Sequence, residues 1–591
     1  MPSFPADHHP TWDYLILTAS NDRQAATYEA QLSVRRKLGR LPEFGAVMVV
    51  ADPGGRRVGS GGSTLVCLMR VLRRESQRVA GGTLDWPAME RILRGLRILI
   101  VHAGGDSRRV PAYGPCGKIF SPIPDVASVG DAAAGPAIAT LFDRLIPLFR
   151  ELPHGLQGTG QVAVTAGDAL MLFDPSSVRL DRPGITALGA YATPEAASKH
   201  GVFCIHPDGS VRRFLQKPSP ADQARYEAID SAGRAILDLA VMSFDAEAAV
   251  AMFRAMDVTP GPDGPAMSPA AEQLVLERGL DLYREISCAL GSEATAEHHR
   301  TSALASGSKW PDEWLGRVHR AMRPVPLAVE VLAQCAFLHF GTTRQLITSG
   351  LELVRHDLQC SPHTPCADAA GDCPNFRAAK MGLSPSRPPI LSMNNCTTGD
   401  GRIEGADGWV EGCRLAAPLV LAGQNVVIGV DVDRPLTLPR GACLDVIAGR
   451  TRGGRPAWFV RCYDISDTFK DTLDRGGTFL GRPLGQWLAA VGAAPEDIWD
   501  VAVAPAARSL WDASVFPAVA PAADYRDWLW MFDPAGAGPA EKHAFLTAER
   551  YSVAEIAVLA DLEAFYQRRT RLRAEGPRTN KLDKLIGPKE A

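Results

Sequence analysis

A glycine pair followed by cationic residues is the first feature of this sequence that could do chemistry. The stretch "ILIVHAGGDSRRVPAYGPCGKIFSPIP" (residues 98–124) ends an apolar run in two glycines, and Arg108, Arg109 and Lys118 follow. Glycines let a backbone approach a ligand closely, and amides exposed in such a turn bind anions. Arginine and lysine supply phosphate partners. The spacing fits neither the P-loop nor G-x-G-x-x-G, so the stretch alone leaves a phosphate cradle and a plain tight turn open.

Three further features point to the same chemistry. Asp168 in "VAVTAGDAL" follows a strand and could hold Mg²⁺, although a helix N-cap would use the same residue type. Lys217 in "FLQKP" stands just before a proline, where a surface lysine is the alternative. "RVGSGGST" (57–64) opens a helix, so the amides of Gly61 and Gly62 could bind another anion, unless the stretch is a flexible connector.

Taken together, these residues fit one reaction. The α-phosphate of a nucleoside triphosphate is attacked by the phosphate oxygen of a second substrate, and pyrophosphate leaves. That step needs amides and cations around the triphosphate, a metal, and a lysine to hold the attacking phosphate. The protein positions the groups and neutralises charge, and it forms no covalent intermediate.

The elements that must position these residues alternate between apolar runs and helical stretches. The apolar runs 14–19, 45–53, 97–105 and 160–171 predict strands of a doubly wound, mostly parallel sheet that is covered on both faces. Ligands of such sheets bind at the carboxyl ends of the strands, where both glycine-containing motifs fall. A hairpin is expected at 200–218, and helical patterns dominate from about 222 to 340, "LAVEVLAQCAFL" (327–338) included.

The second half of the chain changes character. We expect a nucleotidyltransferase-type domain over 12–355, a connecting loop over 356–388, a β-helical domain over 389–480 and a mostly helical region over 481–591. A small β-sandwich is the alternative for the third part. The cysteines and histidines at 356–373 are spaced too widely for a structural zinc site, which favours a loop. The basic run 568–584 favours a solvated C-terminal helix.

Bulk properties exclude several classes of protein. The 591 residues carry a net charge of −3, which offers no general footprint for nucleic acid. No apolar run long enough to span a membrane and no secretory signal are evident. The 12 cysteines are scattered, so we expect reduced thiols and a cytoplasmic protein. Whether identical chains assemble into a homo-oligomer stays open.

The motifs resemble those of sugar-1-phosphate nucleotidyltransferases. "AGGDSRRVP" with the downstream lysine is similar to the signature AGGxGTRLxP…PK, "TAGDAL" to the metal-binding strand end, and "FLQKP" to F-x-E-K-P. "LDLAVMSFD" (237–245) resembles the sugar-contacting N-x-G-I-Y-x-F strand. Together with "DYLILTASNDRQAATYEAQLSVRR", "RRVGSGGSTLVCL" and "FLHFGTTRQL", they resemble the fucose-1-phosphate guanylyltransferase branch over most of the chain.

This resemblance implies a GT-A-like fold and a Mg²⁺-dependent reaction of GTP with β-L-fucose 1-phosphate, without nucleic-acid or membrane partners. It implies that Arg109 and Lys118 neutralise triphosphate charge, that Lys217 orients the sugar phosphate, that Asp168 holds the metal and that Asp238 contacts the sugar. The implied nucleotide contacts are Ala103, Gly104, Gly105, Asp106, Ser107 and Arg108, with Gly61 and Gly62 in support.

Departures from the motifs leave alternatives open. Ser107 replaces the usual glycine, Gln216 a glutamate and Asp238 an asparagine. The same chemistry on another sugar 1-phosphate or with another base is one alternative, and a catalytically silent sugar-nucleotide binding protein is the other. We expect no sugar kinase activity, because no kinase-type glycine loop follows residue 340.

Overall fold

The computed structural model describes residues 12–78, 84–124, 138–359, 391–399 and 401–575. The chain divides into two compact units: unit 1 comprises residues 1–105 and 143–337, and unit 2 comprises 106–142 and 338–591. This division differs from the predicted one, because the segment 106–142 groups with the C-terminal part rather than with the strands around it.

Unit 1 is built on a mixed nine-stranded sheet with the order β12-β6-β9-β4-β3-β1-β2, to which β7 and β8 attach at β9. β2, β1, β3 and β4 run parallel, as do β12 and β6, which confirms the predicted parallel segment. β9 runs antiparallel to β4, β6 and β7, so the sheet is mixed. The strands are β1 (Tyr14–Ala19), β2 (Ala46–Ala51), β3 (Arg97–His102), β4 (Gln161–Ala166), β6 (Ile185–Ala192), β7 (Gly201–Ile205), β8 (Val211–Gln216), β9 (Ala235–Phe244) and β12 (Leu327–Leu332).

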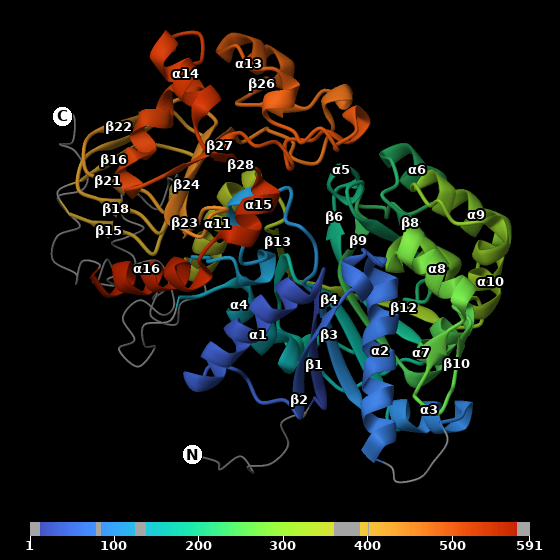
Figure 1. Ribbon diagram of the computed structural model, residues 1–591. Helices are drawn as coiled ribbons and strands as arrows, with labels where there is room; N and C mark the ends of the chain where they lie inside the picture. Colours follow the sequence, from blue (N-terminus) through green and yellow to red (C-terminus); the bar gives the residue numbers. More distant parts are fainter. Residues whose placement is uncertain (1–11, 79–83, 125–137, 360–390, 400, 576–591) are drawn as a thin grey trace, which may run out of the picture. The chain divides into compact units, whose positions relative to one another are not determined.

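Both faces of this sheet are buried, as continuous apolar strands require. Tyr14 and Ile16 belong to the core that α2, α3 and α7 cover, while Leu15 and Leu17 point to the opposite face and are also fully buried. α1 and α2 lie on opposite sides of the sheet (Figure 1). The helices are α1 (Asp22–Lys37), α2 (Gly59–Arg78), α3 (Trp86–Arg94), α4 (Leu141–Arg150), α5 (Pro194–Ala197), α6 (Pro220–Arg225), α7 (Ala246–Ala255), α8 (Pro269–Arg278), α9 (Ala296–Ala305) and α10 (Asp312–Met322).

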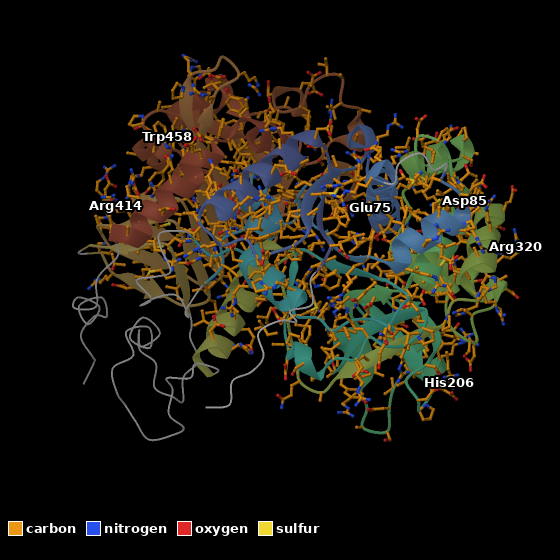
Figure 2. The ribbon with its side chains drawn as sticks, turned by 90° about the horizontal axis from the view of Figure 1, so that it is seen from below. Glu75, Asp85, His206, Arg320, Arg414 and Trp458 are labelled. Atoms are coloured by element: carbon orange, nitrogen blue, oxygen red, sulfur yellow. The ribbon has the colours of Figure 1, made fainter. Side chains whose placement is uncertain are left out.

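A polar contact joins the C-terminal end of α2 to the first residue of β1. Glu75, labelled in Figure 2, accepts a hydrogen bond from the Tyr14 hydroxyl and pairs with Arg78 on the same helix. Burial and the Glu75 carboxylate together raise the pKa of Tyr14 to about 12. The phenol therefore stays protonated and keeps donating to Glu75.

Two predicted elements of unit 1 are wrong in detail. The apolar run 160–171 is two strands, β4 and β5 (Ala169–Leu172), because the chain turns at Gly167 and Asp168. "LAVEVLAQCAFL" is not helical but forms β12 and β13 (Ala336–His339). A short apolar run of this kind does not distinguish a buried strand from a helix by its periodicity, and β12 pairs with β6 in the sheet. The hairpin at 200–218 is confirmed as β7 and β8.

Unit 2 contains a strand-rich region in which short strands repeat at a constant interval. Three parallel ladders form, and each residue pairs with the residue 17 positions later, as in Trp409 with Val426 and Leu419 with Leu436. The ladders are β14 (Leu391–Asn394), β17 (Gly408–Glu411), β20 (Asn425–Ile428) and β23 (Ala442–Arg450); β15 (Thr397–Thr398), β18 (Arg414–Leu415) and β21 (Asp431–Val432); and β16 (Ile403–Gly405), β19 (Leu419–Leu421) and β22 (Leu436–Leu438).

The corners between these strands repeat with the same interval. Asn395, Gly412 and Gly429 adopt positive φ, and so do Asp407, Gln424 and Gly441. Asparagine, aspartate and glycine all tolerate this left-handed conformation, so different residue types serve the same corner. The sequence period looks irregular for that reason, although the backbone period is constant.

The remainder of unit 2 packs strands and helices around this region. β24 (Pro456–Asp464), β27 (Phe516–Val519) and β28 (Arg550–Tyr551) extend the β23 sheet with antiparallel pairs. The longer helices are α11 (Thr343–Gln359), α13 (Leu484–Val491), α14 (Pro539–Thr547), α15 (Val553–Leu559) and α16 (Leu562–Glu575).

Some predictions for unit 2 need correction, and others fall outside the described residues. His356 lies in the last turn of α11 rather than in a loop, whereas Cys360, His363, Cys366 and Cys373 lie outside the described residues. Short strands interrupt the region predicted as mostly helical, 481–591. Within the described residues, no helix is both long and apolar enough to cross a membrane.

Candidate active site

The parallel strands of unit 1 place the ends of β1, β2, β3 and β4 along one edge of the sheet. Ser20 follows β1, Asp52 follows β2, Ala103 follows β3 and Gly167 follows β4. In open α/β sheets this edge is where ligands bind. Ala103, Gly104, Gly105 and Asp168, predicted from motifs far apart in the sequence, are therefore brought to neighbouring strand ends.

Hydroxyl groups at the end of β1 and just after it hold the amides of the glycine turn. The Ala103 and Gly104 N–H groups lie 3.2 and 3.3 Å from Thr18 Oγ1, and the Gly105 N–H donates to Ser20 Oγ. These amides have partners within the protein, which differs from the expectation that they are exposed for a triphosphate. The hydroxyls fix the turn instead.

Side chains of α1 hold the carbonyl groups of the same turn. Tyr28 Oη donates to the Ala103 carbonyl at 2.8 Å, and Gln24 Nε2 donates to the Gly105 carbonyl at 3.1 Å. Gln24 Oε1 also accepts from the Ser20 N–H at 2.7 Å. Gln24 and Tyr28 were not among the predicted site residues, although the polar run that follows the first apolar strand was a visible signal.

The two glycines of the turn serve different needs. A Cβ on Gly104 would lie 3.3 Å from the Ala19 carbonyl carbon, so glycine permits a close approach to β1. Gly105 has φ +121°, and no atom lies within 4 Å of the position its Cβ would occupy. Glycine is needed there for backbone conformation, and the space beside it is open.

Asp168 and Asp238 lie near the same tyrosine. Asp168 stands in the turn between β4 and β5, and the preceding Gly167 donates its N–H to the His102 carbonyl at 3.0 Å. The pKa of Tyr283 is raised well above its usual value, first by burial and then by carboxylates that include Asp238 and Asp168. The predicted metal ligand and the predicted sugar contact thus both act electrostatically on Tyr283, as does Asp281.

Asp238 is a buried carboxylate in an irregular part of β9. Its side chain accepts from the Ala240 N–H at 2.9 Å, and Ala240 adopts φ +57° where the pairing with β6 shifts register. Burial raises the pKa of Asp238 to about 7, and the Ala240 hydrogen bond opposes this only in part. A buried carboxyl group that titrates near neutrality is typical of functional sites.

Lys217 is held at the end of β8 by its backbone. It adopts φ +51° and donates its N–H to the His200 carbonyl at 2.9 Å. Gly201 pairs with Gln216, the residue before Lys217, and a Cβ on Gly201 would lie 3.1 Å from the Asp238 Cβ. Lys217 and Asp238 therefore lie on opposite sides of β7 in the β7–β8–β9 corner of unit 1.

The second glycine-rich stretch has a packing role. Gly61 and Gly62 lie in the first turn of α2, and both donate their N–H groups to the Leu280 carbonyl, at 2.8 and 3.1 Å. A Cβ on Gly59 would lie 2.3 Å from that same oxygen. The predicted nucleotide contact through these two amides conflicts with this geometry, because the amides already have an acceptor.

The remaining predicted residues lie in unit 2. Arg108 and Asp106 form an ion pair at 3.0 Å, and the Arg108 guanidinium lies 5.5 Å from the Trp511 ring centroid. The side chain of Arg109 is exposed. Lys118 begins a short 3-10 turn (Lys118–Phe120) after Gly117.

Ser107 also lies in this stretch of unit 2. It is buried with φ +56°, the conformation that explains why related motifs carry glycine there.

The donor set at the strand ends suits a hard cation. Magnesium is bound through one or two carboxylates together with substrate phosphates, and Asp168 offers such an oxygen ligand at a strand end, with Asp238 near the same tyrosine. Among the described residues, no group of three or more His, Cys, Asp or Glu side chains gathers as a complete protein-made metal site. Asp168 therefore offers one oxygen ligand of the kind that magnesium uses together with substrate phosphates.

Comparison with known proteins shows a family match over most of this chain. The family described as "Fucose pyrophosphorylase domain" matches residues 90–521. The chain is 27% identical over 541 residues to a bifunctional fucokinase/GDP-fucose pyrophosphorylase of Arabidopsis thaliana, covering 83% of this chain and 45% of that protein. It is 25% identical over 456 residues to an L-fucokinase/L-fucose-1-P guanylyltransferase of Bacteroides fragilis, covering 76% and 40%.

A shorter relative matches over most of its length. The chain is 25% identical over 496 residues to a fucose-1-phosphate guanylyltransferase of Mus musculus, covering 78% of this chain and 75% of that protein. The chain thus spans less than half the length of the two bifunctional relatives and three quarters of the mouse protein.

Proposed function

Since this chain belongs to the fucose pyrophosphorylase domain family, we propose that it joins GTP to β-L-fucose 1-phosphate and releases GDP-L-fucose and pyrophosphate. A phosphate oxygen of the sugar phosphate attacks the α-phosphorus of GTP, and the bond from that phosphorus to the bridging oxygen of pyrophosphate breaks. The family match over 90–521 carries the proposal, and the strand-end arrangement of the glycine turn and Asp168 supports it.

Each polar residue has a task in this reaction. Arg109 and Lys118 neutralise charge on the α- and β-phosphates, and Lys217 orients the attacking sugar phosphate. Asp238 accepts hydrogen bonds from sugar hydroxyls. Burial favours this role, because it raises the pKa of Asp238 to about 7 and removes water as a hydrogen-bond donor. A sugar hydroxyl would supply the donor that water does not. Thr18, Ser20, Gln24 and Tyr28 keep the glycine turn in one conformation.

Magnesium is the metal that Asp168 would hold. When bound, Mg²⁺ neutralises phosphate charge and helps to align the triphosphate. We also propose that unit 1 has a GT-A-like fold and that the ladders of unit 2 wind into a β-helix, which the constant interval of 17 residues supports. A cytoplasmic location is supported by the nine described cysteines, all of which are free thiols.

The test is pyrophosphate release by the purified full chain with Mg²⁺, four nucleoside triphosphates and a panel of sugar 1-phosphates. We expect release with GTP and fucose 1-phosphate, and a decrease of about 10³-fold or more in Asp168→Asn and Lys118→Ala. Asp174→Asn, at a nearby exposed 3-10 turn, is the matched control and should retain full activity. Release with another pair would change the specificity, and nucleotide binding without any release would contradict the enzymatic proposal.

A further inference from the structure

The stretch 106–123 of unit 2 carries the predicted cations Arg108, Arg109 and Lys118, and distant residues hold its backbone. Five of its carbonyl oxygens accept hydrogen bonds from residues at least 234 positions later in the chain. The donors are Thr343 N–H to Arg109 at 2.8 Å, Arg461 to Pro111 at 2.9 Å and to Ala112 at 3.2 Å, Tyr566 Oη to Phe120 at 3.0 Å, and Asn394 Nδ2 to Ile123 at 2.7 Å.

Arg461 contacts two of these carbonyls and a buried carboxylate with one guanidinium group. It lies on β24 directly opposite Asp445 on β23, its Nε is 2.5 Å from Asp445 Oδ1, and both side chains are 1% exposed. The two terminal nitrogens of the same guanidinium donate to the successive carbonyls of Pro111 and Ala112. A planar fork is required to reach one carboxylate and two carbonyls at once, and lysine does not have one.

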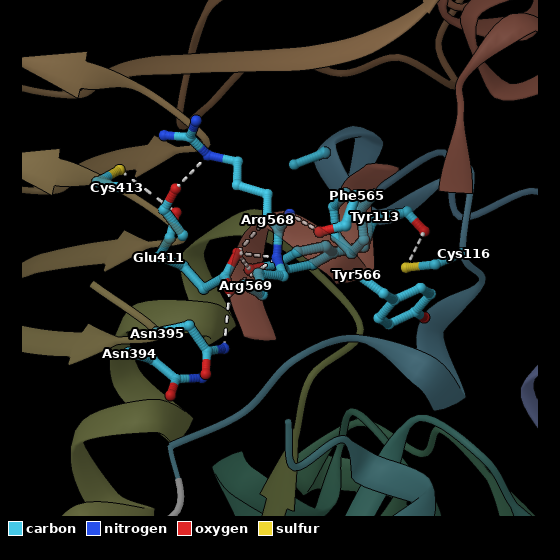
Figure 3. Close-up of polar contacts among 12 residues, drawn as sticks. Tyr113, Cys116, Asn394, Asn395, Glu411, Cys413, Phe565, Tyr566, Arg568 and Arg569 are labelled. Atoms are coloured by element: carbon cyan, nitrogen blue, oxygen red, sulfur yellow. Dashed lines mark hydrogen bonds and ion pairs between the residues drawn. The ribbon is translucent and has the colours of Figure 1, made fainter. Parts of the chain in front are cut away.

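A second buried ion pair fixes the next residue of the stretch (Figure 3). Arg569 of α16 contacts both oxygens of Glu411, and the two side chains are 2% and 0% exposed. Tyr113 Oη donates to Glu411 at 3.4 Å and accepts from Trp409 Nε1 at 3.0 Å. A buried charge without a partner is costly, so these pairs restrict the backbone around 111–113 to the conformation that satisfies them.

We propose that Arg461, held by Asp445, is a positioning residue of the transferase reaction. It fixes the backbone two residues after Arg109 and so sets where the cations of 106–123 meet the triphosphate. The strand-rich region of unit 2 then contributes to the reaction by positioning these cations. The proposal rests on the proposed function, because it assigns these cations to GTP. A displacement of about 1 Å in groups of this kind lowers turnover about 10²-fold.

The test is Arg461→Lys in the full chain, which keeps the charge and removes the fork. We expect kcat/KM for GTP to fall about 10- to 100-fold and the KM for fucose 1-phosphate to change less than about twofold, since Lys217 and Asp238 belong to unit 1. Amide hydrogen exchange within 106–123 should become faster. Arg550→Lys is the matched control: this buried arginine of unit 2 donates to the Asp497 carbonyl and stacks on Phe545. It should lower stability without changing the kinetics for GTP.

The outcomes separate the two proposals. A wild type without turnover contradicts the proposed function, and hydrogen exchange then still reports whether Arg461 orders the stretch. A wild type that turns over, with an Arg461→Lys variant that resembles Arg550→Lys in stability and the wild type in kinetics, overturns the positioning role. Should Arg461→Lys fail to fold, Tyr566→Phe removes the hydroxyl that donates to the Phe120 carbonyl and also hydrogen-bonds Cys116, both within 106–123. It should lower kcat/KM for GTP about 3- to 10-fold, and unchanged kinetics would contradict the proposal.

Discussion

Two buried carboxylates, Asp238 in unit 1 and Glu411 in unit 2, are held in opposite ways. In unit 1, Asp238 is 4% exposed and accepts from the Ala240 N–H, and among the described residues no arginine or lysine pairs with it. In unit 2, Glu411 is 0% exposed and accepts hydrogen bonds from the Arg569 guanidinium through both oxygens. Burial by itself would lower the pKa of Arg569, but the Glu411 carboxylate outweighs it, so that pKa is raised.

The difference separates a scaffold from a candidate site. A buried ion pair with complete hydrogen bonds specifies one arrangement of the chain around it. A buried carboxyl group without a cation costs free energy in its charged form, and proteins retain such groups where a ligand or a proton uses them. This contrast supports the role proposed for Asp238 as a sugar contact, whereas Glu411 is a paired carboxylate of the scaffold.

The largest expected effect comes from breaking the pair in unit 2. Arg569→Met leaves Glu411 buried without its cation, and we expect the free energy of unfolding to fall by about 3–5 kcal/mol. Urea unfolding of the full chain, followed by tryptophan fluorescence, measures this change. Arg571→Met, on the same helix but 62% exposed, is the control and should change stability by less than about 0.5 kcal/mol.

A double variant tests whether the cost comes from the pair. Glu411→Gln with Arg569→Met removes both charges and should recover at least half of the stability that the single variant loses. If the double variant is as unstable as the sum of the two single ones, packing of Arg569 rather than the ion pair is responsible. The contrast with Asp238 would then lose its electrostatic basis.

The sequence allowed much of unit 1 to be predicted, because local patterns determine it. The apolar runs that form β1, β2 and β3 are parallel strands, as predicted. Because β3 and β4 also pair in parallel, Ala103 and Asp168 lie at neighbouring strand ends. The clamp of Thr18, Ser20 and Gln24 was missed. Its hydrogen bonds join residues more than 80 positions apart, and the local sequence around a polar residue does not show which distant group it will bind.

The errors in unit 2 have a similar origin. The run containing Arg569 was predicted to be a solvated helix face, whereas Arg569 is buried against Glu411, 158 positions earlier. A basic run predicts that its residues are exposed in general. It does not show which one of them will form a buried ion pair with a distant carboxylate. The repeat of 17 residues was hidden because Asn395 and Gly412 adopt the same corner conformation with different side chains.

The intermediate effect concerns the pH dependence that Asp238 creates. Its folded pKa of about 7 lies above the unfolded value of about 3.9, so the folded state binds the proton more tightly. This contribution to stability is complete below about pH 4 and is lost as the pH rises towards 7. Asp238→Asn removes it, so between pH 4 and 8 the variant should gain about 2–4 kcal/mol relative to the wild type.

Chemical unfolding at pH 4, 5, 6, 7 and 8 measures that difference. Asp174→Asn is the control, because hydrogen bonds from Ser176 lower the pKa of this exposed carboxyl and place its titration below the range tested. A constant difference between Asp238→Asn and the wild type across the range would mean that Asp238 stays charged, as a paired carboxylate does. Asp238 would then resemble Glu411, and the comparison would fail.

The smallest effect concerns Ser107, whose hydroxyl is buried and has no hydrogen-bond partner among the described residues. Ser107→Gly removes this hydroxyl and relieves the φ of +56°, so the free energy of unfolding should rise by about 0.5–1 kcal/mol. Ser107→Ala keeps the backbone conformation strained and separates the two contributions. If the hydroxyl serves the triphosphate, both variants raise the KM for GTP while neither loses stability. A loss of stability in both variants would mean that the hydroxyl has a hydrogen-bond partner within the fold. Ser107 would then stabilise the structure, as Glu411 and Arg569 do, and would not resemble Asp238.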